Sequence, residues 1–120
     1  ALVAVYDAGK VLNQKTGGSQ FIGGIVWGIS LALLEDTWVD PGIGRIVNAN
    51  LADYRLPVSA DIASIEVSAI DAPDTKIDPL GARGIGGIGI AGTGAAVANA
   101  VYHATGKRIR DLPITPDKLL

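Results

Sequence analysis

A glycine-rich segment is the part of this chain whose residue types most directly suggest chemistry. Five of the nine residues from 81 to 89 are glycine, and the alanine-rich segment 92–100 follows them. Such a run packs poorly into a core, because glycine has no side chain and loses much conformational entropy when it is ordered. It instead exposes backbone N–H groups, next to the positively polarised N-terminus of the helix expected to follow. The segment therefore predicts a site for an anionic group, such as the phosphates of a cofactor.

Three of these glycines also match a dinucleotide-binding fingerprint. Gly84, Gly86 and Gly89 fit GxGxxG, and Asp111 lies about where an acid that binds a ribose is expected. The match is weak, because a Rossmann turn follows directly from a buried strand, whereas Asp78-Pro79-Leu80 precedes these glycines. A Rossmann-type nucleotide-binding domain and a glycine loop that packs closely but binds nothing both stay open as interpretations.

Other polar residues indicate little catalytic chemistry. The only histidine, His103, lies near the end of an expected helix, where a cation complements the helix dipole. Asp71, Asp74 and Asp78 lack the spacing of a calcium-binding loop, so we interpret them as solvated charges and predict no metal ligands. Gln20 precedes an apolar segment and could cap a helix or recognise the edge of a heterocycle.

The elements that must position these residues are of both kinds, which predicts an α+β fold. We expect short strands packed with one buried apolar helix, at about residues 20–35, and one alanine-rich helix, at about 93–105, with Gly106 as its C-cap. A polar loop is expected over residues 10–20. The expected strands are residues 2–6, a hairpin formed by 37–39 and 44–47, and residues 62–70 and 107–114.

The apolar segment Phe21–Leu34 is too short to span a bilayer, which needs about 20 residues. We interpret it as a helix that is buried on all sides, with Gly24 and Gly28 each touching another backbone. If one face were exposed instead, the chain would tend to self-associate.

Composition restricts the possible functions further. A net charge of −2 and a pI near 5.1 argue against a nucleic-acid partner, which would need a basic surface. The absence of cysteine excludes a disulfide, a thiolate metal site and iron–sulfur ligation by these residues. The compartment stays open, because a chain without cysteine fits both a reducing compartment such as the cytoplasm and an oxidising one such as the periplasm. The chain contains no methionine, which we interpret as the mark of a fragment or processed product.

The order of several segments resembles the C-terminal end of the molybdenum-cofactor-binding large subunit of the xanthine dehydrogenase and aldehyde oxidoreductase family. It is most similar to the bacterial aldehyde dehydrogenase branch, which uses molybdopterin cytosine dinucleotide. The segments that carry the resemblance are residues 5–13, 20–28, 32–35, 44–45, 50–54 with Pro57, 78–84, 96–106 and 110–116.

This resemblance implies a fragment of a larger molybdenum-cofactor-binding domain. The parent enzyme would oxidise aldehydes or N-heteroaromatic compounds, with the rest of the large subunit and with iron–sulfur and FAD subunits as partners. Neither nucleic acid nor a membrane is expected as a partner. The residues implied to contact the pterin dinucleotide or to lie beside the metal are Lys10, Val11, Leu12, Asn13, Gln14, Lys15, Thr16, Gln20, Arg83, Gly84, Ile85 and Gly86.

The resemblance also draws attention to Gly87, because the family has a glutamate there that acts as the catalytic base. Glycine cannot accept a proton, and loss of a positioned base typically costs about 10²–10⁴ in rate. A naturally inactive member, an engineered or erroneous residue, and a local shift that brings in another acid all stay open. We therefore expect the chain alone to be inactive and to bind no cofactor. A non-catalytic binding or assembly module with the same fold is the alternative.

Overall fold

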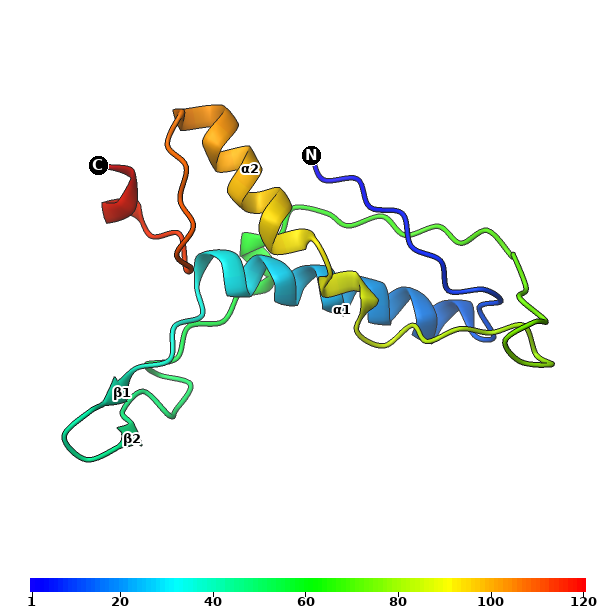
Figure 1. Ribbon diagram of the computed structural model, residues 1–120, viewed down its shortest axis with the longest axis horizontal. Coiled ribbons are helices and arrows are strands. Elements are labelled where there is room, and N and C mark those ends of the chain that lie inside the picture. Colours follow the sequence, from blue (N-terminus) through cyan, green and yellow to red (C-terminus); the bar gives the residue numbers. More distant parts are fainter. The chain divides into compact units, whose positions relative to one another are not determined.

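The computed structural model describes residues 1–120, which divide into two compact units, each built from two segments of the chain. The first unit comprises residues 1–28 and 64–93, and the second comprises residues 29–63 and 94–120. Two α-helices, α1 (Gln14–Leu33) and α2 (Thr93–Thr105), are the longest elements (Figure 1). The remaining elements are a two-stranded sheet, β1 (Val39–Asp40) with β2 (Arg45–Ile46), and the 3₁₀ turns η1 (Ser59–Asp61), η2 (Ile88–Ile90) and η3 (Pro116–Leu119).

Helix α1 begins at Gln14, so the predicted polar loop over residues 10–20 is wrong for most of its length. Asn13 explains the early start, because its side-chain Oδ1 accepts a hydrogen bond from Thr16 N (3.0 Å) and its backbone oxygen accepts one from Gly17 N (2.8 Å). This is an N-cap, which satisfies amides that the first turn leaves without partners. Gly17 and Gly18, which fall in the predicted loop, lie inside the helix.

A stripe of small residues forms the buried face of α1. The buried residues of this face recur at the spacing of one side of a helix, and they are Gly17, Phe21, Gly24, Gly28 and Ala32. A Cβ added at Gly24 would lie 2.8 Å from Gly89 Cα, which is closer than real Cβ atoms approach. At Gly24 the backbone of α1 thus packs directly on the backbone at the end of the glycine-rich segment, as predicted.

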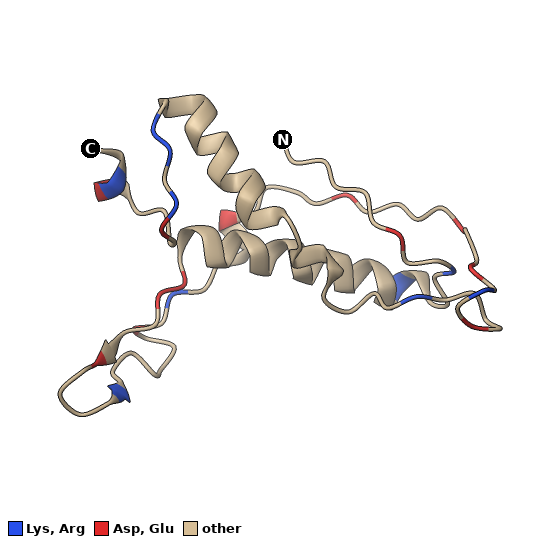
Figure 2. Cartoon of the chain, viewed as in Figure 1, with Lys and Arg blue, Asp and Glu red and all other residues tan.

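Two details of the α1 prediction are wrong. Gly28 faces the Thr93 side chain, not a backbone, with an added Cβ 2.5 Å from Thr93 Cβ. The helix is also not buried on all sides, since Trp27 is 56% exposed and Ile22 and Leu31 are exposed too. The physical reason is that only the small-residue stripe approaches other parts of the chain closely. The exposed face with Ile22, Trp27 and Leu31 carries no charge, because Lys15, in the first turn, is the one charged residue of α1. Figure 2 shows the rest of the helix without charged residues.

Helix α2 has the predicted bounds, and Gly106 ends it. Gly106 has a positive φ of 73°, and its N–H donates to Tyr102 O (2.7 Å), as expected for a C-cap.

The predicted hairpin is confirmed, although its strands are only two residues long. Val39 pairs with Ile46 and Asp40 with Arg45 in antiparallel register. Asp40 Oδ1 accepts a hydrogen bond from Gly42 N (2.7 Å), and Asp40 O accepts one from Gly44 N (2.8 Å). The Asp-Pro-Gly turn signal therefore predicted the correct chain reversal.

The other predicted strands, residues 2–6, 62–70 and 107–114, are wrong. An apolar or alternating segment becomes a strand only when its backbone groups pair with a neighbour, and these segments form no such ladder. Val3 and Val5 are about nine-tenths exposed, and Pro113 has no N–H to donate. The segment after α2 instead attaches through Ile114 N, which donates to Ala32 O (2.7 Å).

Polar contacts hold the second unit around the end of α1. The Tyr54 hydroxyl donates to Glu35 Oε2 (2.8 Å), and Asn48 Nδ2 donates to Asp36 O (2.7 Å). The hydrogen bond to Glu35 is the main reason why the pKa of Tyr54 is raised. Asn48 is buried, so its side-chain bonds fix the path of the chain on either side of the hairpin.

Neither helix has the combination of length and apolar character that crossing a membrane requires.

The Gly24–Gly89 contact generates a stability prediction. Gly24→Ala should lower the free energy of unfolding by about 1–3 kcal/mol, because the added methyl group has no space against the Gly89 backbone. Gly23→Ala is the matched control, since its Cβ would meet nothing within 4 Å and alanine should stabilise the helix by about 0.5–1 kcal/mol. Urea unfolding followed by circular dichroism measures both. Equal effects of the two substitutions would contradict this packing.

Candidate functional site

Two segments far apart in sequence meet beside the start of α1. Gly9 and Ala82 form an isolated antiparallel bridge, in which Arg83 N donates to Ala8 O (2.9 Å) and Lys10 N donates to Gly81 O (2.8 Å). Gly9 has a φ of 59°, and a Cβ there would lie 2.4 Å from Gly81 O, so only glycine allows this approach. The bridge places residues 8–13 next to the beginning of the glycine-rich segment.

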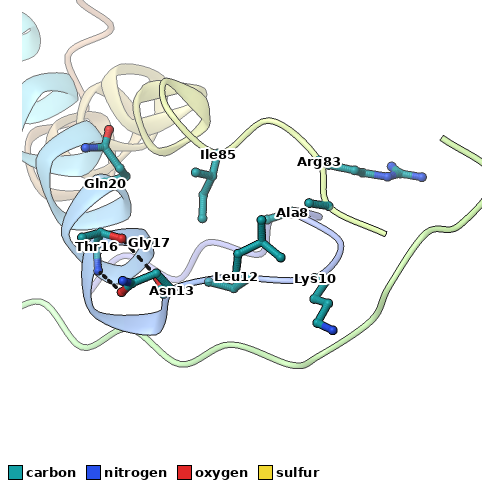
Figure 3. Close-up of a pocket in the computed structure, with 11 residues that line it drawn as sticks. Ala8, Lys10, Leu12, Asn13, Thr16, Gly17, Gln20, Arg83 and Ile85 are labelled. Atoms are coloured by element: carbon teal, nitrogen blue, oxygen red, sulfur yellow. Dashed lines mark hydrogen bonds between the residues drawn. The ribbon is translucent and has the colours of Figure 1, made fainter. Parts of the chain in front are cut away.

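Arg83 anchors this junction through two carboxylates. Its Nη1 lies 2.7 Å from Asp7 Oδ2, and its Nε and Nη2 both donate to Asp74 Oδ2. The hydrogen bond from Arg83 is the largest reason why the pKa of Asp74 is lowered, and the same bond raises the pKa of Arg83. The guanidinium therefore points away from the pocket described next, as Figure 3 shows.

A pocket of about 220 Å³ lies between residues 8–13, the first two turns of α1 and residues 82–85. Its apolar wall is formed by Val11, Leu12 and Ile85, and Lys10 and Gln20 are among its polar lining residues (Figure 3). Both of these polar residues are exposed, and neither side chain has a hydrogen-bond partner within the chain. A cation, a free amide and an apolar wall can together hold a flat, polar, negatively charged molecule.

The structure brings together most of the residues that the resemblance implied. The pocket is lined by Lys10, Val11, Leu12, Asn13, Thr16, Gln20, Arg83 and Ile85. Four other residues that the resemblance implied do not line the pocket, namely Gln14, Lys15, Gly84 and Gly86. Gln20 lies in the second turn of α1 and does not cap the helix, so its amide is free for recognition.

Three further lining residues, Ala8, Gly17 and Ala82, were missed. Ala8 and Ala82 line the pocket because the bridge at Gly9 brings them there, and no local sequence pattern predicts that pairing. Gly17 is different, because the spacing Gly17–Gly24–Gly28 along one helical face is visible in the sequence.

Gly87 lies outside the pocket, directly before η2. Its φ is −107° and ψ is 0°, and a Cβ there would meet nothing within 4 Å. The backbone can therefore accept a side chain at this position without strain.

No group of three or more His, Cys, Asp or Glu side chains is placed to hold a metal ion. Of the three loop aspartates, Asp74 pairs with Arg83 and Asp78 Oδ1 accepts a hydrogen bond from Leu80 N (2.7 Å). The Rossmann interpretation is wrong, because no strand leads into Gly84 and the following helix begins only at Thr93.

Comparison with known proteins gives the family. Residues 1–63 match the model of the molybdopterin cofactor-binding domain. The chain belongs to this family. The matched range includes residues 8–13 and all of α1, and thus one whole side of the pocket.

Relatives extend the similarity over nearly the whole chain. The chain is 49% identical over 119 residues to the aldehyde oxidoreductase molybdenum-binding subunit PaoC of Escherichia coli (strain K12), covering 99% of this chain and 16% of the relative. It is 34% identical to the xanthine dehydrogenase molybdenum-binding subunit of Escherichia coli O157:H7, with 98% and 16% covered. The chain thus spans about a sixth of the length of these curated relatives.

A solved structure agrees with the fold. Quinoline 2-oxidoreductase from Pseudomonas putida 86 aligns with a TM-score of 0.78 and 30% identity, over 94% of this chain and 14% of that one.

The anchoring of Arg83 generates a pH prediction. The pKa of Asp74 is lowered in the folded state, so the ionised carboxylate stabilises the fold. This contribution to the free energy of unfolding is fully present above the ordinary pKa of 3.8, and it is lost as the pH falls below 3.8 through the lowered pKa. Asp74→Asn should therefore be less stable than the wild type near neutral pH, and the difference should shrink below pH 3.8. Asp71→Asn is the control, because Asp71 makes no ion pair. Thermal unfolding between pH 2.5 and 7 measures this difference, and a pH-independent difference would contradict the anchor.

Proposed function

We propose that this chain is part of the large subunit of a molybdenum hydroxylase, and that its pocket holds part of the molybdopterin cofactor. Residues 1–120 would form the C-terminal portion of the cofactor-binding domain. The observation that carries the proposal is the pocket itself, because eight of its eleven lining residues are those implied by the resemblance. They come from two segments about 70 residues apart in sequence, which only the fold unites.

The residues present fit one portion of such a cofactor. The wall of Val11, Leu12 and Ile85 suits the face of a flat ring, and the Lys10 ammonium suits a phosphate. Pockets that enclose a whole ligand usually have volumes of about 300–1,000 Å³, so a pocket of 220 Å³ would hold only part of a dinucleotide. The rest of the cofactor would be held by other parts of the parent subunit.

Each polar group of the pocket has a role in this proposal. Lys10 would neutralise cofactor charge, and the free amide of Gln20 would donate to and accept from the edge of a heterocycle. The positive dipole end at the start of α1 would favour the same anion. Arg83 would contribute its aliphatic stem and backbone, since Asp7 and Asp74 already hold its guanidinium.

The parent activity follows from the family and from the names of the relatives. When bound, the molybdenum cofactor would supply the redox chemistry, and the protein would supply binding, orientation and a base. We propose molybdopterin cytosine dinucleotide as its form and aldehydes or N-heteroaromatic compounds as substrates. Several relatives are named as subunits, which supports further subunits in the parent, and we propose that these carry iron–sulfur centres and FAD.

Gly87 would occupy the position of the catalytic base in this proposal. No acid is near enough in sequence to replace it, because residues 84–91 contain only glycine, isoleucine and alanine. The alternative, a binding or assembly module without catalysis, would follow if the parent protein binds the cofactor but gains nothing from an acid at this position.

Cofactor binding tests the pocket. In the parent subunit, Lys10→Ala should weaken cofactor retention by about 10–100-fold, the value of a hydrogen bond to a charged group. Lys76→Ala is the matched control, since Lys76 is a lysine of the same unit that does not line the pocket. Molybdenum and pterin content after dialysis is the measurement. Equal retention by both variants would refute the assignment of this pocket.

A separate test addresses the base. In the parent complex, Gly87→Glu should raise the rate of aldehyde oxidation by about 10²–10⁴, the contribution expected of one general base. The stability of the protein should change by less than about 0.5 kcal/mol, because the position is open and its φ is negative. Gly86→Glu is the control, because it places the same side chain at an equally open position one residue away. It should give no comparable gain in rate. Turnover at equal molybdenum occupancy is the measurement, and no gain in rate would mean that Gly87 is not a lost base.

A further inference from the structure

We propose that Tyr6 is a positioning residue for position 87, acting through the carbonyl group of Gly89; this inference rests on the proposed function. Tyr6 lies outside the pocket. Its hydroxyl donates to Gly89 O (3.1 Å), with a longer contact of 3.5 Å to Ala91 O.

The orientation of Tyr6 is fixed by packing. Its ring stacks on Phe21, with centroids 5.6 Å apart and planes inclined by 14°. Phe21 is 8% exposed and belongs to the buried stripe of α1. The stack on a residue of α1 therefore holds the Tyr6 ring so that its hydroxyl reaches the glycine-rich segment.

A second hydroxyl reaches the same carbonyl. Thr93 Oγ1 donates to Gly89 O at 3.0 Å, and Thr93 is 1% exposed. Two donors saturate the two lone pairs of one carbonyl oxygen. Gly89 also packs against Gly24, so the end of the glycine-rich segment is held on three sides.

The beginning of the segment is held equally well, by the Arg83 backbone bond to Ala8 and by the carboxylates of Asp7 and Asp74. Between these anchors, Gly84, Gly86 and Gly87 have no neighbour within 4 Å of an added Cβ. Glycines without contacts sample many conformations, so the two anchors, together with the contact of Ile85 with Gly17, determine where residue 87 lies. Gly87 is two residues from Gly89, and its carbonyl accepts from Ile90 N (3.3 Å), which transmits the constraint.

Hydrogen exchange tests this inference without any cofactor. Tyr6→Phe keeps the ring stack but removes the donor, and the amides of residues 84–90 should then exchange about fivefold faster, as expected for one lost hydrogen bond. Tyr102→Phe is the matched control, because the exposed Tyr102 hydroxyl has no hydrogen-bond partner in the chain. The amides of α2 should be unaffected in both variants. Unchanged exchange at 84–90, or an equal rise over the whole chain, would overturn the inference.

Kinetics then distinguish positioning from general stability. In a parent complex carrying Gly87→Glu, Tyr6→Phe should lower kcat about three- to tenfold at unchanged KM, whereas in the Gly87 parent it should leave the rate unchanged. A similar loss in both backgrounds would indicate a structural role only and would overturn the inference. If Gly87→Glu itself gives no gain, the base assignment fails, while the exchange experiment still decides the role of Tyr6.

Discussion

The contact between the glycine stripe of α1 and the glycine-rich segment is the constraint on which the rest of the first unit depends. Ile85 approaches Gly17, Gly89 lies on Gly24, and Thr93 contacts Gly28, so the segment follows the helix over about three turns. At Gly24 and Gly89 the two backbones touch, which is possible only where side chains are absent. It fixes one wall of the pocket and the end of the segment that contains Gly87.

This arrangement explains how a segment rich in glycine can be part of a site at all. Ordering glycine costs more entropy than ordering any other residue, so contacts must hold the chain at intervals. Arg83 provides one anchor through charge, and the Gly89 carbonyl provides the other through two hydroxyl groups. The residues between them remain open to a ligand. Both anchors are built from residues of the first unit alone.

Several apolar residues of α1 are exposed in this chain, which spans about a sixth of the length of its relatives. Trp27 and Ile22 lie on an uncharged helical face, where burial in a larger domain would be favourable. The same explanation applies to Val3 and Val5, which have the sequence of a strand but no paired neighbour. A pattern of apolar residues predicts that a surface will be buried, but it does not predict which part of the protein will cover that surface.

The sequence by itself determined the elements whose signals are local. The bounds of α2, its Gly106 cap, the Asp-Pro-Gly hairpin and the resemblance to a molybdenum-cofactor-binding subunit all follow from contiguous residues. Only the tertiary structure decided the absence of three expected strands and the pairing of Gly9 with Ala82. It also assigned Tyr6 to Gly89, 83 residues away. The physical reason is that strand pairing, close backbone contacts and carbonyl anchors join residues distant in sequence, whereas capping and turn formation involve neighbours.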